Sequence, residues 1–240
     1  MQIIQTKQQY ICYNPELLTE TPEMAFSSEF WQQQNKIIGS AQGRGTTWFV
    51  QGEKLAMALR HYRRGGLFGK LVADSYLFSG WDKTRSVAEF SLLNHLIAHQ
   101  VNVPKPVAAR AVRLGWFRYQ ADILVEKIAN SRDLVGILGQ ETLSQQVWFD
   151  VGAMIKRMHD AGVCHTDLNC HNILLDNHKT VWIIDFDKCY RLEGANWQEK
   201  NLARLHRSFI KEQGKRGIYL TRTTGSGYCK VIRVNGNKGQ

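Results

Sequence analysis

Hydrophobic and polar positions follow two different periods along this chain, and short strand-like runs dominate the first half. β-Branched and aromatic residues gather there between glycines and polar turns, which predicts antiparallel strands. The predicted strands are two within residues 37–50, joined by a glycine-rich turn, a third at 55–62, and two short ones at 116–119 and 123–125. Residues 1–35 are polar and rich in glutamine, and we interpret them as an extended or loosely helical lead-in segment.

A period of three to four residues replaces this pattern in three places and predicts amphipathic helices. The helix-like runs are 84–100, 147–158 and 197–213. Ser86 and Glu89 have the spacing of a capping box at the start of the first run, and Gly162 is placed to end the second. Two short apolar runs, 173–175 and 181–184, predict strands around a polar turn. The pattern as a whole predicts an α+β protein.

The composition is that of an ordinary globular protein. The chain has 240 residues, of which 43% are hydrophobic and only four are prolines. These values exclude a disordered tail, a collagen-like fibre and a small disulfide-stabilised scaffold. The 31 Lys and Arg residues exceed the 21 Asp and Glu residues and give a net charge of +10. We therefore expect an anionic partner. The net charge alone does not distinguish among nucleic acid, phosphorylated small molecules and a membrane surface.

Cysteine usage and the N-terminus bear on the compartment. The five cysteines are scattered without a Cys-x-x-Cys pair, and their odd number favours a reducing compartment. The N-terminus has no basic segment followed by an apolar run, and no stretch approaches the roughly 20 apolar residues of a spanning helix. We expect a cytoplasmic protein, or one that lies on a membrane surface without crossing it.

A cluster of polar residues follows the second predicted helix. Residues 165–172 are His-Thr-Asp-Leu-Asn-Cys-His-Asn, and residues 185–187, after the next apolar run, are Asp-Phe-Asp. A loop carboxylate such as Asp167 can accept a proton from an attacking hydroxyl. The amide oxygen of Asn172 and the carboxylate of Asp185 can bind a metal ion that bridges the phosphates of ATP. The order and spacing of these groups predict phosphoryl transfer.

Each part of this pattern also has a simpler interpretation. The glycines of the turn within 37–50 could form an ordinary hairpin, and Glu89 could be only a helix cap. The loop also contains residue types that bind zinc, namely Cys164, His165, Cys170 and His171. Their spacing lacks a Cys-x-x-Cys pair, so we interpret His165 as a structural support of the loop.

The segments 165–172 and 185–187 resemble the catalytic loop and the metal-binding triplet of protein-kinase-like phosphotransferases. The resemblance implies that Asp167 is the catalytic base. It implies further that Asn172 and Asp185 are Mg²⁺ ligands and that ATP is the phosphoryl donor.

The same resemblance implies a fold and a nucleotide site. The fold is a two-lobed protein-kinase-like α+β fold, with a strand-rich N-lobe that carries one helix at 1–125, including the lead-in 1–35, and a small, mostly helical C-lobe at 126–240. Glu126 falls at the hinge, whose backbone would meet adenine. The glycines that would lie over the ATP phosphates are Gly39, Gly43 and Gly45.

The phosphate-binding lysine of the family has no direct counterpart. Arg60 stands in its place, after the triplet 57–59, and could hold the phosphates and pair with Glu89. The planar fork of arginine does not occupy the place of a lysine in the same way. Lys54 is the other candidate.

Further departures argue against a protein substrate. The triplet ends in Asp187 rather than glycine, and Asn169 stands where protein kinases usually have lysine. No proline follows Pro106, so the Ala-Pro-Glu landmark of protein kinases is absent, and the C-terminal half is short.

The segments 43–47, 60–67 and 185–188 are similar to the bacterial lipopolysaccharide kinase family. Membership implies ATP-dependent phosphorylation of a hydroxyl of 3-deoxy-D-manno-octulosonic acid (Kdo), with O4 expected, on a lipid A precursor. It also implies a peripheral location at the anionic cytoplasmic face of the inner membrane. The phosphates of lipid A and the carboxylate of Kdo suit a chain of charge +10, and a nucleic-acid partner is not expected.

A basic and aromatic stretch between residues 63 and 85 has two interpretations, an interfacial patch or a core with solvated charges. Its members are Arg63, Arg64, Lys70, Lys83 and Arg85, interleaved with Leu67, Phe68, Tyr76, Phe78 and Trp81. Two rival functions also stay open: a small-molecule kinase of the aminoglycoside or choline type, and a non-catalytic scaffold that binds nucleotide or nucleic acid. Joint retention of Asp167, Asn172 and Asp185 argues against the scaffold.

Overall fold

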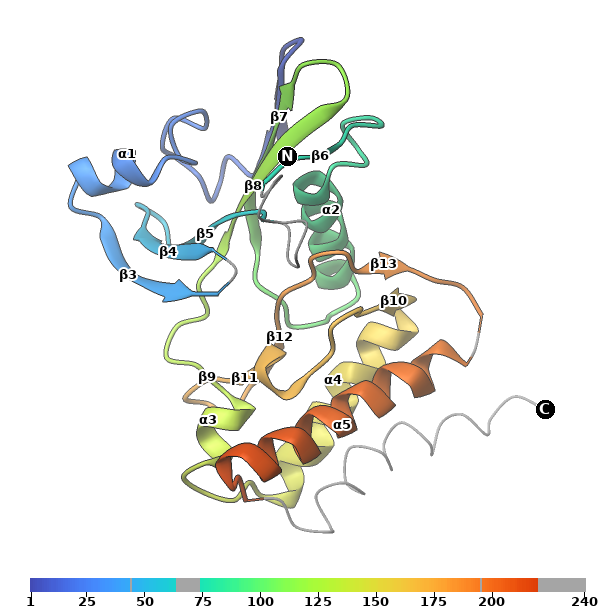
Figure 1. The fold of residues 1–240 in the computed structure, drawn as a ribbon. Helices are drawn as coiled ribbons and strands as arrows, with labels where there is room; N and C mark the ends of the chain where they lie inside the picture. Colours follow the sequence, from blue (N-terminus) through green and yellow to red (C-terminus); the bar gives the residue numbers. More distant parts are fainter. Residues whose placement is uncertain (44, 64–73, 195, 220–240) are drawn as a thin grey trace. The chain divides into compact units, whose positions relative to one another are not determined.

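The computed structural model describes residues 1–43, 45–63, 74–194 and 196–219, and the chain divides into two compact units (Figure 1). The first unit comprises Met1–Asn94 and Pro104–Ile128, and the second comprises His95–Val103 and Ala129–Gln240. Strands dominate the first unit and helices the second, so the α+β class expected from the sequence is confirmed. Among the helices in the described ranges, none is long and apolar enough to cross a membrane.

The first unit is built on one antiparallel sheet. Its strands follow the order β1-β2-β7-β8-β5-β4-β3, and β6 pairs with β8. In chain order the strands are β1 (Gln2–Gln5), β2 (Gln9–Tyr13), β3 (Ile37–Gln42), β4 (Thr46–Gln51), β5 (Ala56–His61), β6 (Tyr76–Leu77), β7 (Pro106–Leu114) and β8 (Arg118–Glu126). β3, β4 and β5 form two consecutive hairpins, as the glycines and the polar turn after residue 50 predict.

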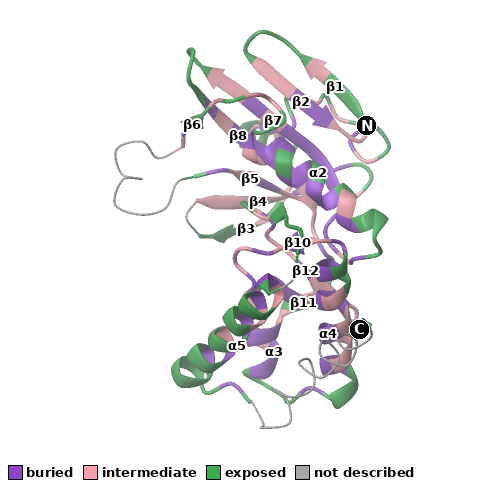
Figure 2. Cartoon of the chain, turned by 90° about the vertical axis from the view of Figure 1, so that its right-hand side faces the viewer, coloured by how far each residue is buried: buried purple, intermediate pink, exposed green. Residues whose placement is uncertain are grey.

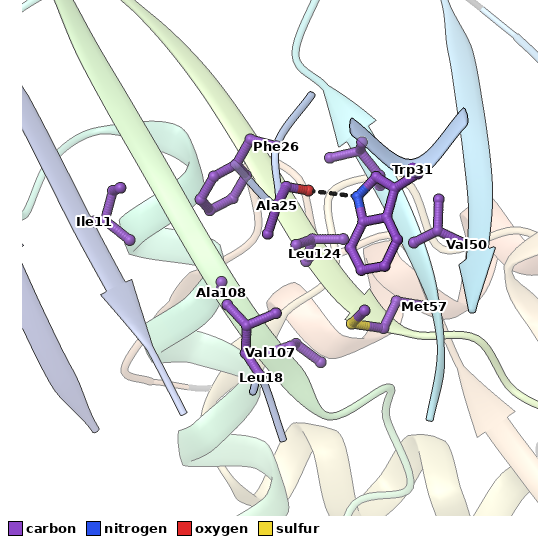
Figure 3. Close-up of a cluster of buried hydrophobic side chains, with 11 residues drawn as sticks. Ile11, Leu18, Ala25, Phe26, Trp31, Val50, Met57, Val107, Ala108 and Leu124 are labelled. Carbon is purple, nitrogen blue, oxygen red and sulfur yellow. Dashed lines mark hydrogen bonds between the residues drawn. The ribbon is translucent and has the colours of Figure 1, made fainter. Parts of the chain in front are cut away.

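The two faces of this sheet are covered by different segments. On one face, α1 (Ser28–Gln33) and the residues before it close a hydrophobic core around the fully buried Trp31 (Figure 3). The indole Nε1 of Trp31 donates to the carbonyl of Ala25, so its polar atom is satisfied inside the core. Met57 of β5 lies in this core. Because side chains alternate along a strand, Arg60 points to the other face, which α2 (Arg85–Ala98) covers.

The interpretation of residues 1–35 as a lead-in segment missed their structural role. β1 and β2 extend the sheet, with Tyr10 of β2 paired with Ala111 of β7. Trp31 and its neighbours supply much of the core described above. The polar composition misled because Gln2 and Gln5 at the two ends of the edge strand β1 are exposed, whereas Ile11 and Cys12 of β2 are buried in the sheet.

Two other local predictions were wrong. α2 begins at Arg85, so Ser86 lies inside the helix, and its hydroxyl donates to the carbonyl of Arg110 instead of closing a capping box. The apolar pair Trp116 and Phe117 is the turn between β7 and β8 rather than the start of a strand. Both errors have one reason: the short sequence pattern does not show that β7 lies beside Ser86 and ends before Trp116.

The second unit is mostly helical. Its helices are α3 (Leu134–Leu138), α4 (Gln145–Asp160) and α5 (Trp197–Arg216), with a 3₁₀ turn η2 (Cys170–Asn172). Its short strands are β9 (Arg132–Asp133), β10 (Val163–Cys164), β11 (Ile173–Leu175), β12 (Val181–Ile183) and β13 (Tyr190–Arg191). β12, β11 and β9 form one small sheet, and β10 pairs with β13.

The ends of the helices follow their sequence signals. Ser144 caps α4, its hydroxyl accepting from the N–H of Val147. Gly162, at φ 72°, turns the chain out of α4 in the left-handed conformation that glycine favours. α5 buries a stripe that includes Trp197, Leu205 and Phe209, while the rest of its surface is mainly exposed (Figure 2).

Candidate active site

The loop that contains Asp167 connects β10 to η2 in the second unit. His165, which is completely buried, holds this loop. Its Nδ1 accepts from the N–H of Asp167 at 3.2 Å, so its Nε2 carries the proton and donates to the carbonyl of Ile184 at 3.0 Å. Burial lowers the pKa of His165, which keeps the ring neutral. The ring also packs against Phe186, with centroids 4.8 Å apart.

Hydrogen bonds to backbone carbonyls hold the two expected metal ligands against this loop, Asn172 directly and Asp185 through the residue before it. Asn172 Nδ2 donates to the carbonyl of Asp167 at 3.0 Å, and the N–H of Ile184 donates to the carbonyl of Asn172 at 3.0 Å. Asp185 follows directly, at a left-handed φ of 64°. The second unit therefore brings Asp167, Asn172 and Asp185 together, as the sequence predicts.

The oxygens of this group suit a divalent cation. Within the described ranges no hydrogen bond is made to the side-chain oxygen of Asn172, because its amide nitrogen is the atom that the loop uses. Mg²⁺ binds through one or two carboxylates, other hard oxygens and substrate phosphates. One amide oxygen and one carboxylate, from Asn172 and Asp185, fit that requirement. The described residues hold no cluster of three or more His, Cys, Asp or Glu side chains placed to bind a metal.

α5 contributes contacts that the sequence analysis did not predict. Four residues of the helix, one on each successive turn, contact four residues of the loop in the same order along the chain. The pairs are Asn201 Nδ2 to the His165 carbonyl (2.6 Å), Arg204 Nη2 to Asp167 Oδ1 (2.9 Å), Cys170 N to Ser208 Oγ (3.0 Å) and His171 Nε2 with Glu212 Oε1 (3.7 Å). The sequence carries no local signal for these contacts, because polar residues on a helix ordinarily face solvent; only the structure shows that Asn201 and Glu212 are buried.

The first unit holds the expected ion pair. Arg60 on β5 donates through Nη2 to both carboxylate oxygens of Glu89 on α2, each at 2.6 Å. The hydroxyl of Tyr62 also donates to Glu89. Lys54 lies instead in the exposed turn between β4 and β5. The geometry therefore pairs Arg60, and not Lys54, with the helix glutamate.

His61, the next residue on β5, makes a second charged contact on the sheet. Its Nδ1 lies 2.7 Å from Asp122 Oδ1 on β8, and Arg110 on β7 donates to the other carboxylate oxygen at 2.9 Å. The hydrogen bond to Asp122 raises the pKa of His61, with burial acting in the opposite direction. Folding therefore makes the imidazole of His61 easier to protonate than it is in the unfolded chain.

The glycine-rich turn joins β3 to β4. Gly39 lies at an irregularity in the pairing of these strands, and the N–H of Gly43 donates to the carbonyl of Gly45 at 3.0 Å. A Cβ at Gly45 would lie 2.9 Å from Cδ of the exposed Arg63, a flexible side chain that can move aside, so the space at Gly45 does not by itself require glycine. Arg44, between these glycines, lies outside the described residues.

Glu126 is the last residue of β8. Its N–H donates to the carbonyl of Lys105 at 2.9 Å, and its carboxylate pairs with the Lys105 amine at 3.6 Å. The N–H of Lys127 donates to Ala56. These two N–H groups are therefore engaged within the sheet, and a contact of Glu126 with adenine stays a prediction.

Of the two interpretations of the stretch between residues 63 and 85, the described residues favour packing over an interfacial patch. Tyr76 is buried, and Arg85 lies over its ring at 4.6 Å. Trp81 stacks on Tyr10 and packs edge-on against Phe78, so these rings belong to an aromatic cluster. The members that lie outside the described residues are Arg64, Leu67, Phe68 and Lys70.

Comparisons with known proteins agree with this geometry. A model of the lipopolysaccharide kinase (Kdo/WaaP) family matches residues 28–222. The chain is 95% identical, over the full length of both proteins, to a 3-deoxy-D-manno-octulosonic acid kinase of Photobacterium damsela subsp. piscicida. It is 56% identical to a protein of the same name from Vibrio cholerae, over 91% of this chain and 92% of the relative.

A solved structure shares the fold. It is WaaP in complex with acyl carrier protein, which matches with a TM-score of 0.63 over 92% of this chain and 88% of that chain, at 16% identity. That likeness supports the kinase-like fold alone. The family match over most of the chain, together with the near-identical relative, shows that the chain belongs to the lipopolysaccharide kinase (Kdo/WaaP) family.

Proposed function

We propose that this protein transfers the γ-phosphoryl group of ATP to a hydroxyl of Kdo, at O4, on a lipid A precursor. The observation that carries the proposal is the arrangement around His165, which fixes Asp167, Asn172 and Asp185 in one hydrogen-bonded unit. The name of the 95% identical relative supports the choice of sugar. The acceptor position and the lipid context rest on the family resemblance.

In this mechanism each side chain has one task. The Asp167 carboxylate orients the acceptor hydroxyl and takes its proton as the new P–O bond forms. Asn172 and Asp185 would hold Mg²⁺, which supplies charge neutralisation at the phosphates when bound. Arg60, fixed by Glu89, would hold the phosphates of ATP. The glycines Gly39, Gly43 and Gly45 would cover those phosphates with backbone N–H groups.

The experiment that tests the proposal compares acceptors and a base variant. Wild-type protein is given ATP, Mg²⁺ and a Kdo-bearing lipid A precursor, beside a panel of aminoglycosides, choline and free sugars. We expect turnover with the Kdo acceptor, and a loss of about 10²- to 10⁴-fold in Asp167→Asn. Preferred turnover of a molecule from the panel would favour the small-molecule kinase instead, and nucleotide binding without turnover would favour the scaffold.

We also propose that the protein associates with an anionic membrane surface. The support is the tip of the β7–β8 hairpin, where Trp116 and Phe117 are 82% and 74% exposed. Leu77 on the neighbouring β6 and Leu114 are exposed as well. The exposed Arg118 adjoins these side chains. Exposed aromatic side chains beside cations are typical of surfaces that enter the interfacial layer of anionic lipids.

The neighbouring turn adds positive charge to this tip. The N–H of Arg113 donates to the carbonyl of Gln8 at 2.7 Å, which brings the exposed Lys7 of the β1–β2 turn beside the end of β7. Residues 106–121 contain no Asp or Glu. The tip therefore combines apolar bulk with a charge opposite to that of the cytoplasmic lipid surface.

A further inference from the structure

Arg204 differs from the other α5 residues that contact the catalytic loop. Asn201 and Glu212 are buried and Ser208 is half-buried, whereas the side chain of Arg204 is 48% exposed. Its Nη2 donates to Oδ1 of Asp167 at 2.9 Å. Across the described part of the chain no other acceptor is assigned to its guanidinium, which carries further N–H donors. The guanidinium of Arg204 therefore contacts Asp167 through Nη2, and its other N–H groups face solvent.

The loop itself offers no cation at this place. Residues 165–172 contain neither Lys nor Arg. Asn169, which stands where protein kinases usually have lysine, donates its Nδ2 to the carbonyl of Asp167 at 2.9 Å and so supports the backbone of the loop. The positive charge beside the base comes from α5 instead.

We propose that Arg204 binds the carboxylate of the acceptor sugar and so places the acceptor hydroxyl on Asp167. This inference rests on the proposed function, because Kdo carries a carboxylate on the ring that holds the reacting hydroxyl. A guanidinium matches a carboxylate in a planar, two-point contact. With Oδ1 of Asp167 held by Arg204, Oδ2 is the oxygen that receives the hydroxyl proton.

The surroundings of Arg204 favour an anionic acceptor. Three further cations lie at exposed positions of α5: Lys200 four residues before Arg204, Arg207 three residues after it, and Lys211 four residues after Arg207. Residues at this spacing share one side of a helix, so the cations form a stripe that starts beside the base. The phosphates of a lipid A precursor would meet the same stripe.

An ordinary surface ion pair is the competing explanation, and it makes a different prediction. An exposed Arg–Asp pair contributes little to stability, and its loss would leave the affinity for the acceptor unchanged. The test is therefore kinetic, with ATP and the acceptor varied separately.

The variants are Arg204→Gln and Arg204→Lys, with Arg157→Gln as the control, since Arg157 is an exposed arginine on α4 of the same unit and lies outside the stripe on α5. We expect Arg204→Gln to raise the KM for the Kdo acceptor by about 10- to 100-fold, the range of a charge-assisted hydrogen bond. The KM for ATP and the thermal midpoint should stay unchanged. Arg204→Lys should recover part of the loss, and the control should resemble wild type.

A second arm identifies the group that Arg204 binds. An acceptor whose Kdo carboxylate is converted to the amide should be a poor substrate for wild type, and Arg204→Gln should discriminate little between acid and amide. Equal discrimination by both proteins would overturn the inference, as would a raised KM for ATP in place of the acceptor. Failure of wild type to phosphorylate the acid acceptor would refute the proposed function, and this inference with it.

Discussion

The ion pair between Arg60 and Glu89 allows a stabilising role to be separated from a catalytic one. Glu89 is 4% exposed and Arg60 26% exposed, and the contact distances are 2.6 Å. Removing one partner of a buried pair costs about 3–5 kcal/mol, because the other charge stays desolvated. Arg60 is partly solvated, so we expect Arg60→Met to lower the free energy of unfolding by about 2–3 kcal/mol. For a chain of this size that corresponds to a drop of about 4–12 °C in the midpoint.

A second substitution should restore stability without restoring activity. In Arg60→Met/Glu89→Gln the buried charge is gone, and the Gln oxygen can still accept from Tyr62, which donates to Glu89 in the native chain. Replacing both charged partners by neutral groups is often nearly neutral. We therefore expect the double variant to recover all but about 1 kcal/mol. Both Arg60→Met and the double variant should lack ATP turnover, because no guanidinium is present to hold the phosphates.

Urea unfolding measures the effect on stability, and the dependence of the initial rate on ATP concentration, which gives kcat and the KM for ATP, measures the effect on catalysis. Lys54→Met is the control, and we expect it to change neither, since Lys54 lies in an exposed turn. An unchanged unfolding midpoint in Arg60→Met would refute the desolvation argument. Normal turnover in the double variant would show that the pair is purely structural and that another cation holds the phosphates.

Three other expectations follow from single features of the fold. Asp185→Asn should raise the Mg²⁺ concentration needed for half-maximal turnover and lower the rate, and an unchanged Mg²⁺ titration would remove Asp185 from the metal site. The raised pKa of His61 means that its protonated form adds stability below about pH 6.5, which is lost as the pH rises through the folded-state pKa. His61→Gln should therefore be more destabilising at about pH 5.5 than at about pH 8.5 in urea unfolding, and the reverse order would contradict the assignment. Trp116→Ser/Phe117→Ser should weaken binding to phosphatidylglycerol vesicles by about tenfold or more, whereas Ile210→Ser, which removes an exposed apolar side chain of α5, should not.

Local patterns were sufficient where a contact lies close in sequence or at the end of an element. The hairpins after Gly39, the end of α4 at Gly162 and the loop from His165 to Asn172 depend on neighbours along the chain, and the sequence predicted them. The contact between Arg60 and Glu89 spans 29 residues and came from the family resemblance. The contact of Arg204 with Asp167 spans 37 residues and has no local signal.

The same limit explains the errors in the first unit. β1 and β2 are short, their apolar residues do not alternate regularly, and β2 pairs with the distant β7, so no local pattern reveals the pairing. The apolar character of Trp116 and Phe117 suggested a strand because burial is the usual reason for such residues. Here they are exposed at a turn.

The regular contacts between α5 and the loop 165–172 constrain the number of residues between the contacting positions of the helix, although most of its surface is exposed. Asn201, Arg204, Ser208 and Glu212 meet the loop at intervals of three and four residues. Deleting one residue between them would rotate everything beyond the deletion by about 100° around the helix axis. A deletion at the exposed Ala203 would therefore separate the base from its arginine while leaving every catalytic side chain in the sequence. Along this helix, we expect substitutions of exposed residues outside the stripe of cations to be tolerated, whereas changes of length are not.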